Sequence, residues 1–260
     1  MSEDRRLGRL LLVPTPLDFG VSKHGAPPDL QDVLPLGVIR QAAALTHWVA
    51  ENAKTARAFL KRVNAIVPLA LPLQAQQIAE LPRPAKGAKG AQASSLDGLL
   101  APALQGQDIG LVSEAGMPAI ADPGAALVQA AHRLGIVVLP LSGASSLLLA
   151  LAASGLNGQS FAFVGYLPVD AVARAARIRE LEALSRRAGQ AQLAIETPYR
   201  NPALLAALLA HLQPATRLSV SCGLTLAEGW TQSNSVAAWR AKPTALPTDV
   251  PAVFALQATA

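Results

Sequence analysis

Residues 111–146 read LVSEAGMPAIADPGAALVQAAHRLGIVVLPLSGASS, and this stretch decides the fold class. Two apolar runs, residues 109–112 and 136–141, have the length and composition of buried strands. Each run is followed directly by a turn of small residues, at 113–116 and at 142–146. Open α/β sheets bind ligands at strand ends, and small residues let backbone groups approach a ligand closely. The stretch therefore predicts a small-molecule site built largely from backbone.

The rest of the chain alternates short apolar runs with helical patterns. We expect further strands at residues 10–13, 48–50, 66–67, 160–166, 192–196, 217–221 and 253–256. We expect helices at residues 36–45, 54–63, 125–134, 145–154, 171–187 and 202–212. This alternation predicts an α/β protein with substantial parallel sheet. A seam near Leu141 predicts two α/β domains, residues 1–141 and 142–260, while residues 83–95 read as a low-complexity surface loop or a basic flap.

Composition narrows the functional classes. Hydrophobic residues make up 51% and charged residues 15% of the 260 residues, which excludes a disordered chain. The single cysteine, Cys222, excludes an internal disulfide and a cysteine zinc site, and the four scattered histidines predict no metal. No apolar run approaches the roughly 20 residues of a membrane span, so we expect a cytoplasmic protein without a membrane partner. The net charge of +5 fits an anionic partner such as nucleic acid, or an ordinary basic protein.

Five motifs in order carry a resemblance to a known family. They are SEAGMP at 113–118, DPG at 122–124, SGASS at 142–146, FAFVGYLP at 161–168 and ETPYR at 196–200. Together they resemble the signature turns of the tetrapyrrole-methylase superfamily. Within it they are most similar to the ribosomal small-subunit RNA 2′-O-ribose methyltransferases and their uncharacterised relatives. Five ordered motifs are far more specific than a lone glycine pattern.

The resemblance implies two α/β domains of tetrapyrrole-methylase type, with S-adenosylmethionine in the cleft between them, and a homodimer. It also implies which positions bind the cofactor. Those in the first half are Pro14, Thr15, Ser113, Glu114, Ala115 and Gly116. Those in the second half are Ser145, Ser146, Ala153 and Phe163, with Glu196 near the cofactor as the candidate catalytic residue.

The chain also departs from the branch at several positions. Residues 50–54 read AENAK where the branch has Ala-Glu-Asp-Thr-Arg, and its polar His-Asn-Glu segment is not visible at 68–77. The tetrapyrrole subfamily's Gly-x-Gly-x-Gly first turn is also absent at 13–17, which read VPTPL. Four interpretations stay open: an RNA methyltransferase, a methyltransferase acting on a tetrapyrrole or other small molecule, a cofactor-binding protein without turnover, and a generic nucleotide-binding α/β protein.

The expected chemistry needs few side chains. S-adenosylmethionine supplies an activated methyl group, so the protein must align the acceptor and exclude water. A ribose hydroxyl must also lose its proton, for which Glu196, Glu51 and Glu114 are the candidate carboxylates. The alternative for Glu196 is a structural role at a strand end.

Other polar residues have simpler interpretations. Asp122 is expected to be the N-cap of the helix at 125–134, and Cys222 an inert thiol in the core. Arginines at 174, 177, 179, 186 and 187 form either a solvated helix face or a phosphate-binding one. Tyr199 and Arg200 are the pair that most suggests contact with substrate.

Overall fold

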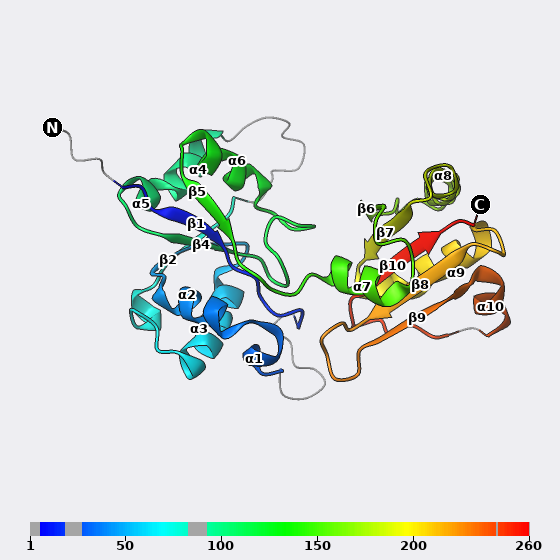
Figure 1. Cartoon of the computed structure of the whole chain (residues 1–260), viewed down its shortest axis with the longest axis horizontal. Coiled ribbons are helices and arrows are strands. Elements are labelled where there is room, and N and C mark those ends of the chain that lie inside the picture. The colour runs from blue at the N-terminus through cyan, green and yellow to red at the C-terminus, as the bar shows by residue number, and fades with distance from the viewer. Residues whose placement is uncertain (1–5, 19–27, 83–92, 243, 260) are drawn as a thin grey trace. The chain divides into compact units, whose positions relative to one another are not determined.

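A computed structural model describes residues 6–18, 28–82, 93–242 and 244–259 of the chain. The chain divides into two compact units, Met1–Ala144 and Ser145–Ala260, each built from one sheet with helices packed on it (Figure 1). The division falls close to the predicted seam at Leu141. Most of the predicted basic flap at 83–95 lies outside the described residues.

The first unit is built on a fully parallel sheet with the strand order β3-β2-β4-β1-β5. Its strands are β1 (Arg9–Leu12), β2 (His47–Ala50), β3 (Gln77–Glu80), β4 (Ile109–Val112) and β5 (Val137–Pro140). The inner strand β1 pairs Leu10 with Ile109 of β4 on one side and with Val138 of β5 on the other. Since the sheet is parallel, the carboxyl ends of all five strands meet at one edge, which is where open α/β sheets bind ligands.

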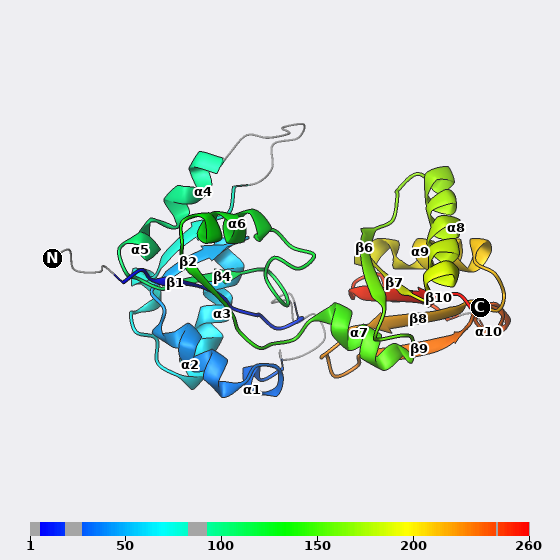
Figure 2. The same ribbon diagram turned by 45° about the horizontal axis from the view of Figure 1, so that its top comes forward.

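Helices cover both faces of this sheet (Figure 2). They are α1 (Leu30–Val33), α2 (Leu36–Ala44), α3 (Ala53–Ile66), η1 (Leu73–Ala75), α4 (Ala93–Leu99), α5 (Ala101–Leu104) and α6 (Ala125–Arg133). Successive strand residues point to opposite faces, so Leu11 packs with α2 and α3 whereas Leu10 packs with α5 and α6. Burial on both faces explains why β1 and β4 are continuous apolar runs and not alternating ones.

One strand prediction in this unit is wrong. Residues 66 and 67 are the end of α3 and its C-cap, where the Val67 N–H donates to the Val63 carbonyl at 2.9 Å. The third strand of the sheet is instead β3, which reads QIAE. It is an edge strand whose residues are half-buried or exposed. Its sequence therefore lacks the apolar run that marks the central strands.

The second unit has a mixed sheet with the order β6-β7-β10-β8-β9. Its strands are β6 (Phe161–Tyr166), β7 (Ala191–Glu196), β8 (Arg217–Cys222), β9 (Trp230–Ser235) and β10 (Ala252–Gln257). Only β6 and β7 run parallel, whereas β10 is antiparallel to both of its neighbours, β7 and β8. The predicted parallel sheet is thus complete in the first unit and limited to one strand pair in the second.

Two helical layers enclose this second sheet. Its helices are α7 (Ser146–Ser154), α8 (Ala171–Ala188), η2 (Pro198–Arg200), α9 (Asn201–His211) and α10 (Val236–Ala241). Along β10, Phe254 packs with α8, α9 and α10, whereas Val253 packs with Leu147 and Leu151 of α7. Alternation along β10 therefore places α7 on one face and the other long helices on the opposite one. Across the described part of the chain, no helix is both long and apolar enough to cross a bilayer.

Candidate functional site

Two turns are tied together at the carboxyl edge of the first sheet. The N–H of Thr15, after β1, donates to the carbonyl of Gly116, after β4, and the N–H of Gly116 donates to the carbonyl of Thr15, both at 3.0 Å. The buried Thr15 hydroxyl donates to the Ser113 carbonyl at 3.3 Å. The adjacent strands β1 and β4 are parallel, so the segments that follow them leave the sheet at the same edge and lie together.

The turn after β5 joins them through close backbone contacts. A Cβ on Gly143 would lie 2.3 Å from Cγ of Pro14, so only glycine fits there. Gly116 has a φ of +82°, and a Cβ at that position would lie 3.6 Å from the Ala144 carbonyl oxygen. Three turns that follow three neighbouring strands therefore meet, and small residues let their backbones approach one another closely.

Carboxylates gather at the same edge. Glu51 follows β2 and Glu114 follows β4, and the Glu114 N–H lies 3.4 Å from Oε2 of Glu51, which accepts its hydrogen bond. Asp122 lies close enough for its charge to interact with both. Burial, then the negative charges of Glu51 and Glu114, raise the pKa of Asp122 to about 6, against a hydrogen bond from Ser113 that lowers it. One carboxyl of this edge therefore exchanges its proton near neutral pH.

The segment that carries Asp122 has an unusual backbone. Ala119 and Ala121 have φ values of 66° and 64°, a left-handed conformation that costs a non-glycine residue roughly 1–2 kcal/mol. The prediction that Asp122 caps α6 is wrong. The N-cap position is Gly124, with a φ of 137° and no side-chain capping bond. The turns of this segment direct Asp122 toward Ser113 and the two glutamates instead of toward the helix.

The other predicted cofactor residues lie in the second unit. Ser145 occupies the N-cap of α7 without a side-chain capping bond, Ser146 begins that helix, and Ala153 is exposed near its end. Phe163 lies on β6, half-buried against the apolar cluster that includes Leu147 and Leu151 of α7. These positions are thus grouped around α7.

Glu196, the predicted catalytic residue, ends β7 with its side chain only 2% exposed. Its Oε1 accepts hydrogen bonds from the Thr197 N–H at 2.8 Å and the Thr197 hydroxyl at 3.2 Å. Its Oε2 lies 3.0 Å from Nη2 of Arg200 in an ion pair. Both carboxylate oxygens are therefore engaged within the segment 196–200, an arrangement that holds η2 against the end of β7.

The structure thus joins some predicted residues and adds others. It brings together Pro14, Thr15, Ser113 and Gly116, with Glu114 and Ala115 in the same turn. The sequence interpretation missed two participants, Gly143 and Asp122. Both stand in motifs of the sequence, SGASS and DPG, but neither was assigned to the site, and Asp122 reaches the edge through the left-handed residues before it.

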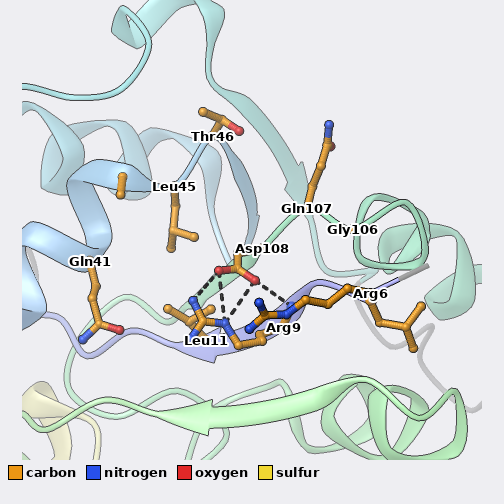
Figure 3. A pocket seen from close by; sticks show the side chains of 11 residues that line it. Arg6, Arg9, Leu11, Gln41, Leu45, Thr46, Gly106, Gln107 and Asp108 are labelled. Carbon is orange, nitrogen blue, oxygen red and sulfur yellow. Dashed lines mark hydrogen bonds and ion pairs between the residues drawn. The ribbon is translucent and has the colours of Figure 1, made fainter. Parts of the chain in front are cut away.

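A cavity of about 590 Å³ lies elsewhere in the first unit, at the amino ends of β1, β2 and β4 (Figure 3). Its dominant interaction is the pair between Arg9 and Asp108, with Nη2 of Arg9 2.6 Å from Oδ2 of Asp108. Hydrogen bonding from Arg9 lowers the pKa of Asp108 below its usual range. This cavity is at the opposite end of the strands from the three turns, so it is separate from the predicted site.

No set of three or more histidine, cysteine, aspartate or glutamate side chains within the described ranges is arranged to hold a metal ion. The polar groups of the site are backbone amides, hydroxyls and three carboxylates. Such groups can bind a small polar ligand, position an acceptor and take up a proton.

Comparisons with curated proteins give local but clear similarity. A segment of 65 residues is 54% identical to the ribosomal RNA small subunit methyltransferase I of Halalkalibacterium halodurans, covering 25% of this chain and 22% of that protein. Proteins of the same name match from Pseudomonas aeruginosa, with 44% identity over 30% of this chain and 27% of that protein, and from Vibrio cholerae, with 45% over 32% and 29%. The aligned segments thus span less than a third of each of these relatives.

Solved structures resemble the whole chain. The methyltransferase CobJ matches with a TM-score of 0.56 and 15% identity, covering 97% of this chain and 95% of that one. The native form of uroporphyrin III C-methyltransferase from Thermus thermophilus matches with a TM-score of 0.54 and 17% identity, over 96% and 97% of the two chains. At these identities the likeness concerns the fold. The sequence model of the Tetrapyrrole (Corrin/Porphyrin) Methylases matches residues 25–229, most of the chain, and the chain therefore belongs to this family.

Proposed function

We propose that this protein is an S-adenosylmethionine-dependent methyltransferase that acts on RNA of the ribosomal type. The proposed acceptor atom is a ribose 2′-hydroxyl oxygen. The observation that carries the proposal is the meeting of three small-residue turns, around Thr15, Gly116 and Gly143, at the carboxyl edge of a parallel sheet in a chain of the methylase family. The choice of RNA is supported by the relatives that are named ribosomal RNA methyltransferases and by the net charge of +5.

The residues of the first unit fit the proposed cofactor. Thr15 and Gly116 use their own N–H groups in the bridge between their turns, and the small residues leave little side-chain bulk at this edge, which suits a small ligand packed close to the backbone. The carboxylates of Glu51 and Glu114 suit a ligand that carries an ammonium group, a sulfonium and ribose hydroxyls. Pro14 and Ala115 complete this surface. When bound, the cofactor supplies an activated methyl group.

The proposed task of the chain's own residues is to bind, orient and exchange a proton. Ser145, Ser146, Ala153 and Phe163 are proposed to bind the cofactor from the second unit. A ribose hydroxyl acceptor must give up its proton, and a carboxyl with a pKa of about 6, as at Asp122, is suited to receive one near neutral pH. Glu196 stays the predicted catalytic group of the second unit, although Arg200 and Thr197 occupy its oxygens.

Calorimetry with S-adenosylmethionine, S-adenosylhomocysteine and ATP tests the cofactor first. We expect binding of the first two ligands and none of ATP. Radiolabelled methyl transfer to purified small ribosomal subunits then tests the acceptor, since a 2′-O-methyl group protects the adjacent phosphodiester from alkaline hydrolysis. Label recovered in alkali-resistant dinucleotides supports the proposal.

Other results separate the alternatives. Transfer to a tetrapyrrole and not to RNA would support small-molecule methylation, and cofactor binding without any transfer would support a protein that has lost turnover. No binding of either cofactor form would overturn the proposal. The homodimer and the cytoplasmic location remain predictions, which gel filtration with light scattering and cell fractionation would test.

A further inference from the structure

Two exposed tyrosines stand at one edge of the second unit's sheet. Tyr166 ends β6 with 59% of its surface exposed, and Tyr199 in η2 is 71% exposed. Strands β6 and β7 run parallel, and Tyr166 pairs with Ile195, the residue before Glu196. Both tyrosines therefore lie where the parallel strands β6 and β7 end, and both rings face solvent there.

The segment that carries Tyr199 is firmly held. The Arg200 N–H donates to the Thr197 carbonyl at 2.9 Å, and the guanidinium of Arg200 pairs with the buried Glu196 carboxylate at 3.0 Å. Nη2 of Arg200 is itself buried, while 21% of the side chain stays exposed. An aromatic ring on a fixed turn loses little conformational entropy when it binds a partner.

We propose that Tyr166, Tyr199 and Arg200 form a surface that binds single-stranded RNA by stacking on its bases. Arg200 lies between β7 and α9. This inference rests on the proposed function, because it assigns the contact for the RNA acceptor. Proteins recognise unpaired nucleotides by stacking them on aromatic rings and arginine planes. The exposed Val169 and Val172, 72% and 79% exposed after β6, extend the apolar surface around these rings.

The charge of the surface favours RNA over a protein partner. Arg200 is the cation next to Tyr199, and Arg174, in the first turn of α8 after β6, donates from Nη1 to the Val169 carbonyl at 3.1 Å. Positive side chains that flank exposed aromatic rings match a polyanion whose bases are accessible. An interface for another protein would instead be expected to carry fewer charged residues around an apolar centre.

Fluorescence anisotropy with a labelled, unstructured oligoribonucleotide tests this surface. Tyr166→Ala and Tyr199→Ala are each expected to weaken RNA binding roughly 5- to 100-fold, while Tyr199→Phe keeps the ring and retains most of the affinity. The matched control is Phe161→Ala, which removes an exposed aromatic ring, 41% exposed, from the opposite end of the same strand. We expect that variant to bind RNA like the wild type.

The salt dependence identifies the kind of contact. Loss of a stacked ring should leave the slope of log affinity against log salt unchanged, whereas loss of a phosphate contact would reduce it. Calorimetry of S-adenosylmethionine with the same variants shows whether the cofactor site is intact, and their thermal unfolding shows whether they fold.

The outcomes of the two proposals can be told apart. If the wild type transfers methyl groups to RNA but the tyrosine-to-alanine variants bind RNA normally, the surface is wrong and the proposed function stands. If Phe161→Ala weakens binding as much as they do, the effect is not specific to this edge and the surface is also wrong. If the wild type binds the cofactor but no RNA, and a protein partner protects these tyrosines, both the RNA acceptor and the surface are overturned.

Discussion

Thr15 and Gly116 exchange two backbone hydrogen bonds of 3.0 Å although they are far apart in the sequence. The bridge makes the turns after β1 and β4 into one paired unit at the carboxyl edge of the sheet. Gly116 must remain without a side chain to keep this pairing, because its φ of +82° suits glycine and Leu17 would lie 3.0 Å from a Cβ. Strand order, pairing and glycine therefore together set the position of the proposed cofactor site.

Replacing this glycine should remove cofactor binding. We expect Gly116→Val to fold with reduced stability and to lose S-adenosylmethionine affinity, because a branched side chain would occupy space that the proposed ligand needs. Gly135→Val is the matched control. Gly135 also has a positive φ, +71°, but nothing lies within 4 Å of its Cβ position. The control should lose similar stability, roughly 1–2 kcal/mol, and keep its affinity. Normal calorimetric binding by Gly116→Val would contradict the placement of the site.

Much of this edge was predictable from sequence because each turn directly follows an apolar run. Buried parallel strands need such runs, and small residues after them mark the site, so Ser113 and Gly116 were predicted. The edge strand β3 was not predicted, since it is buried too little to require apolar residues. Asp122 could not be placed from sequence either, because two alanines in left-handed conformations redirect the chain before it. Local pattern thus predicts strands with apolar runs, including the edge strands β5 and β6, whereas a polar edge strand such as β3 and irregular loops depend on tertiary contacts.

The raised pKa of Asp122 predicts a pH-dependent stability. Its pKa of about 6 in the folded protein exceeds the ordinary value near 4, so the folded state holds the proton more tightly than the unfolded state. Its contribution to stability is therefore complete below about pH 4 and is lost as the pH rises through about 6. Asp122→Asn stays neutral, so it should unfold about 2–4 °C above the wild type at pH 8 and match it below pH 4. Thermal unfolding monitored by circular dichroism checks both.

Asp108 is a control whose pKa is shifted in the opposite direction, so its contribution to stability should depend on pH in the opposite way. Hydrogen bonding from Arg9 lowers the pKa of Asp108, so its contribution to stability is present at neutral pH and lost as the pH falls. Asp108→Asn should therefore be less stable than the wild type at pH 8, by at most about 1 kcal/mol for a partly exposed ion pair. An Asp122→Asn variant that is also destabilised at pH 8 would show that its carboxylate is favourably placed after all.

Packing against Trp48 predicts the effect of an added methyl group on β4. A Cβ at Gly110 would lie 2.5 Å from Cε3 of the buried Trp48 ring and 3.0 Å from Cδ1 of Leu45. The ring cannot move freely, because its Nε1 donates to Oε1 of Gln76 at 3.0 Å. Gly110→Ala should therefore destabilise the first unit by about 1–3 kcal/mol. Denaturant titration followed by tryptophan fluorescence measures this.

The matched control for that variant is Gly37→Ala. Gly37 lies in α2 with nothing within 4 Å of its Cβ position, and alanine favours the helix by up to about 1 kcal/mol. The same substitution should therefore raise stability at one glycine and lower it at the other. Equal effects at the two positions would mean that β4 and the Trp48 ring are not packed as the structure places them.

Cys222 offers a specific probe for the opening of the second unit. It is 2% exposed on β8, between β10 and β9, and burial raises the pKa of its thiol to about 11. Disulfide reagents react with the thiolate, so at pH 8 the folded protein should react far more slowly than the denatured chain, where the pKa is ordinary. Since the chain has one cysteine, the thiol released from the reagent measures the reaction of Cys222 alone. The reaction rate should rise with denaturant as the sheet opens, and rapid labelling without denaturant would show that β8 is an exposed strand instead of an inner one.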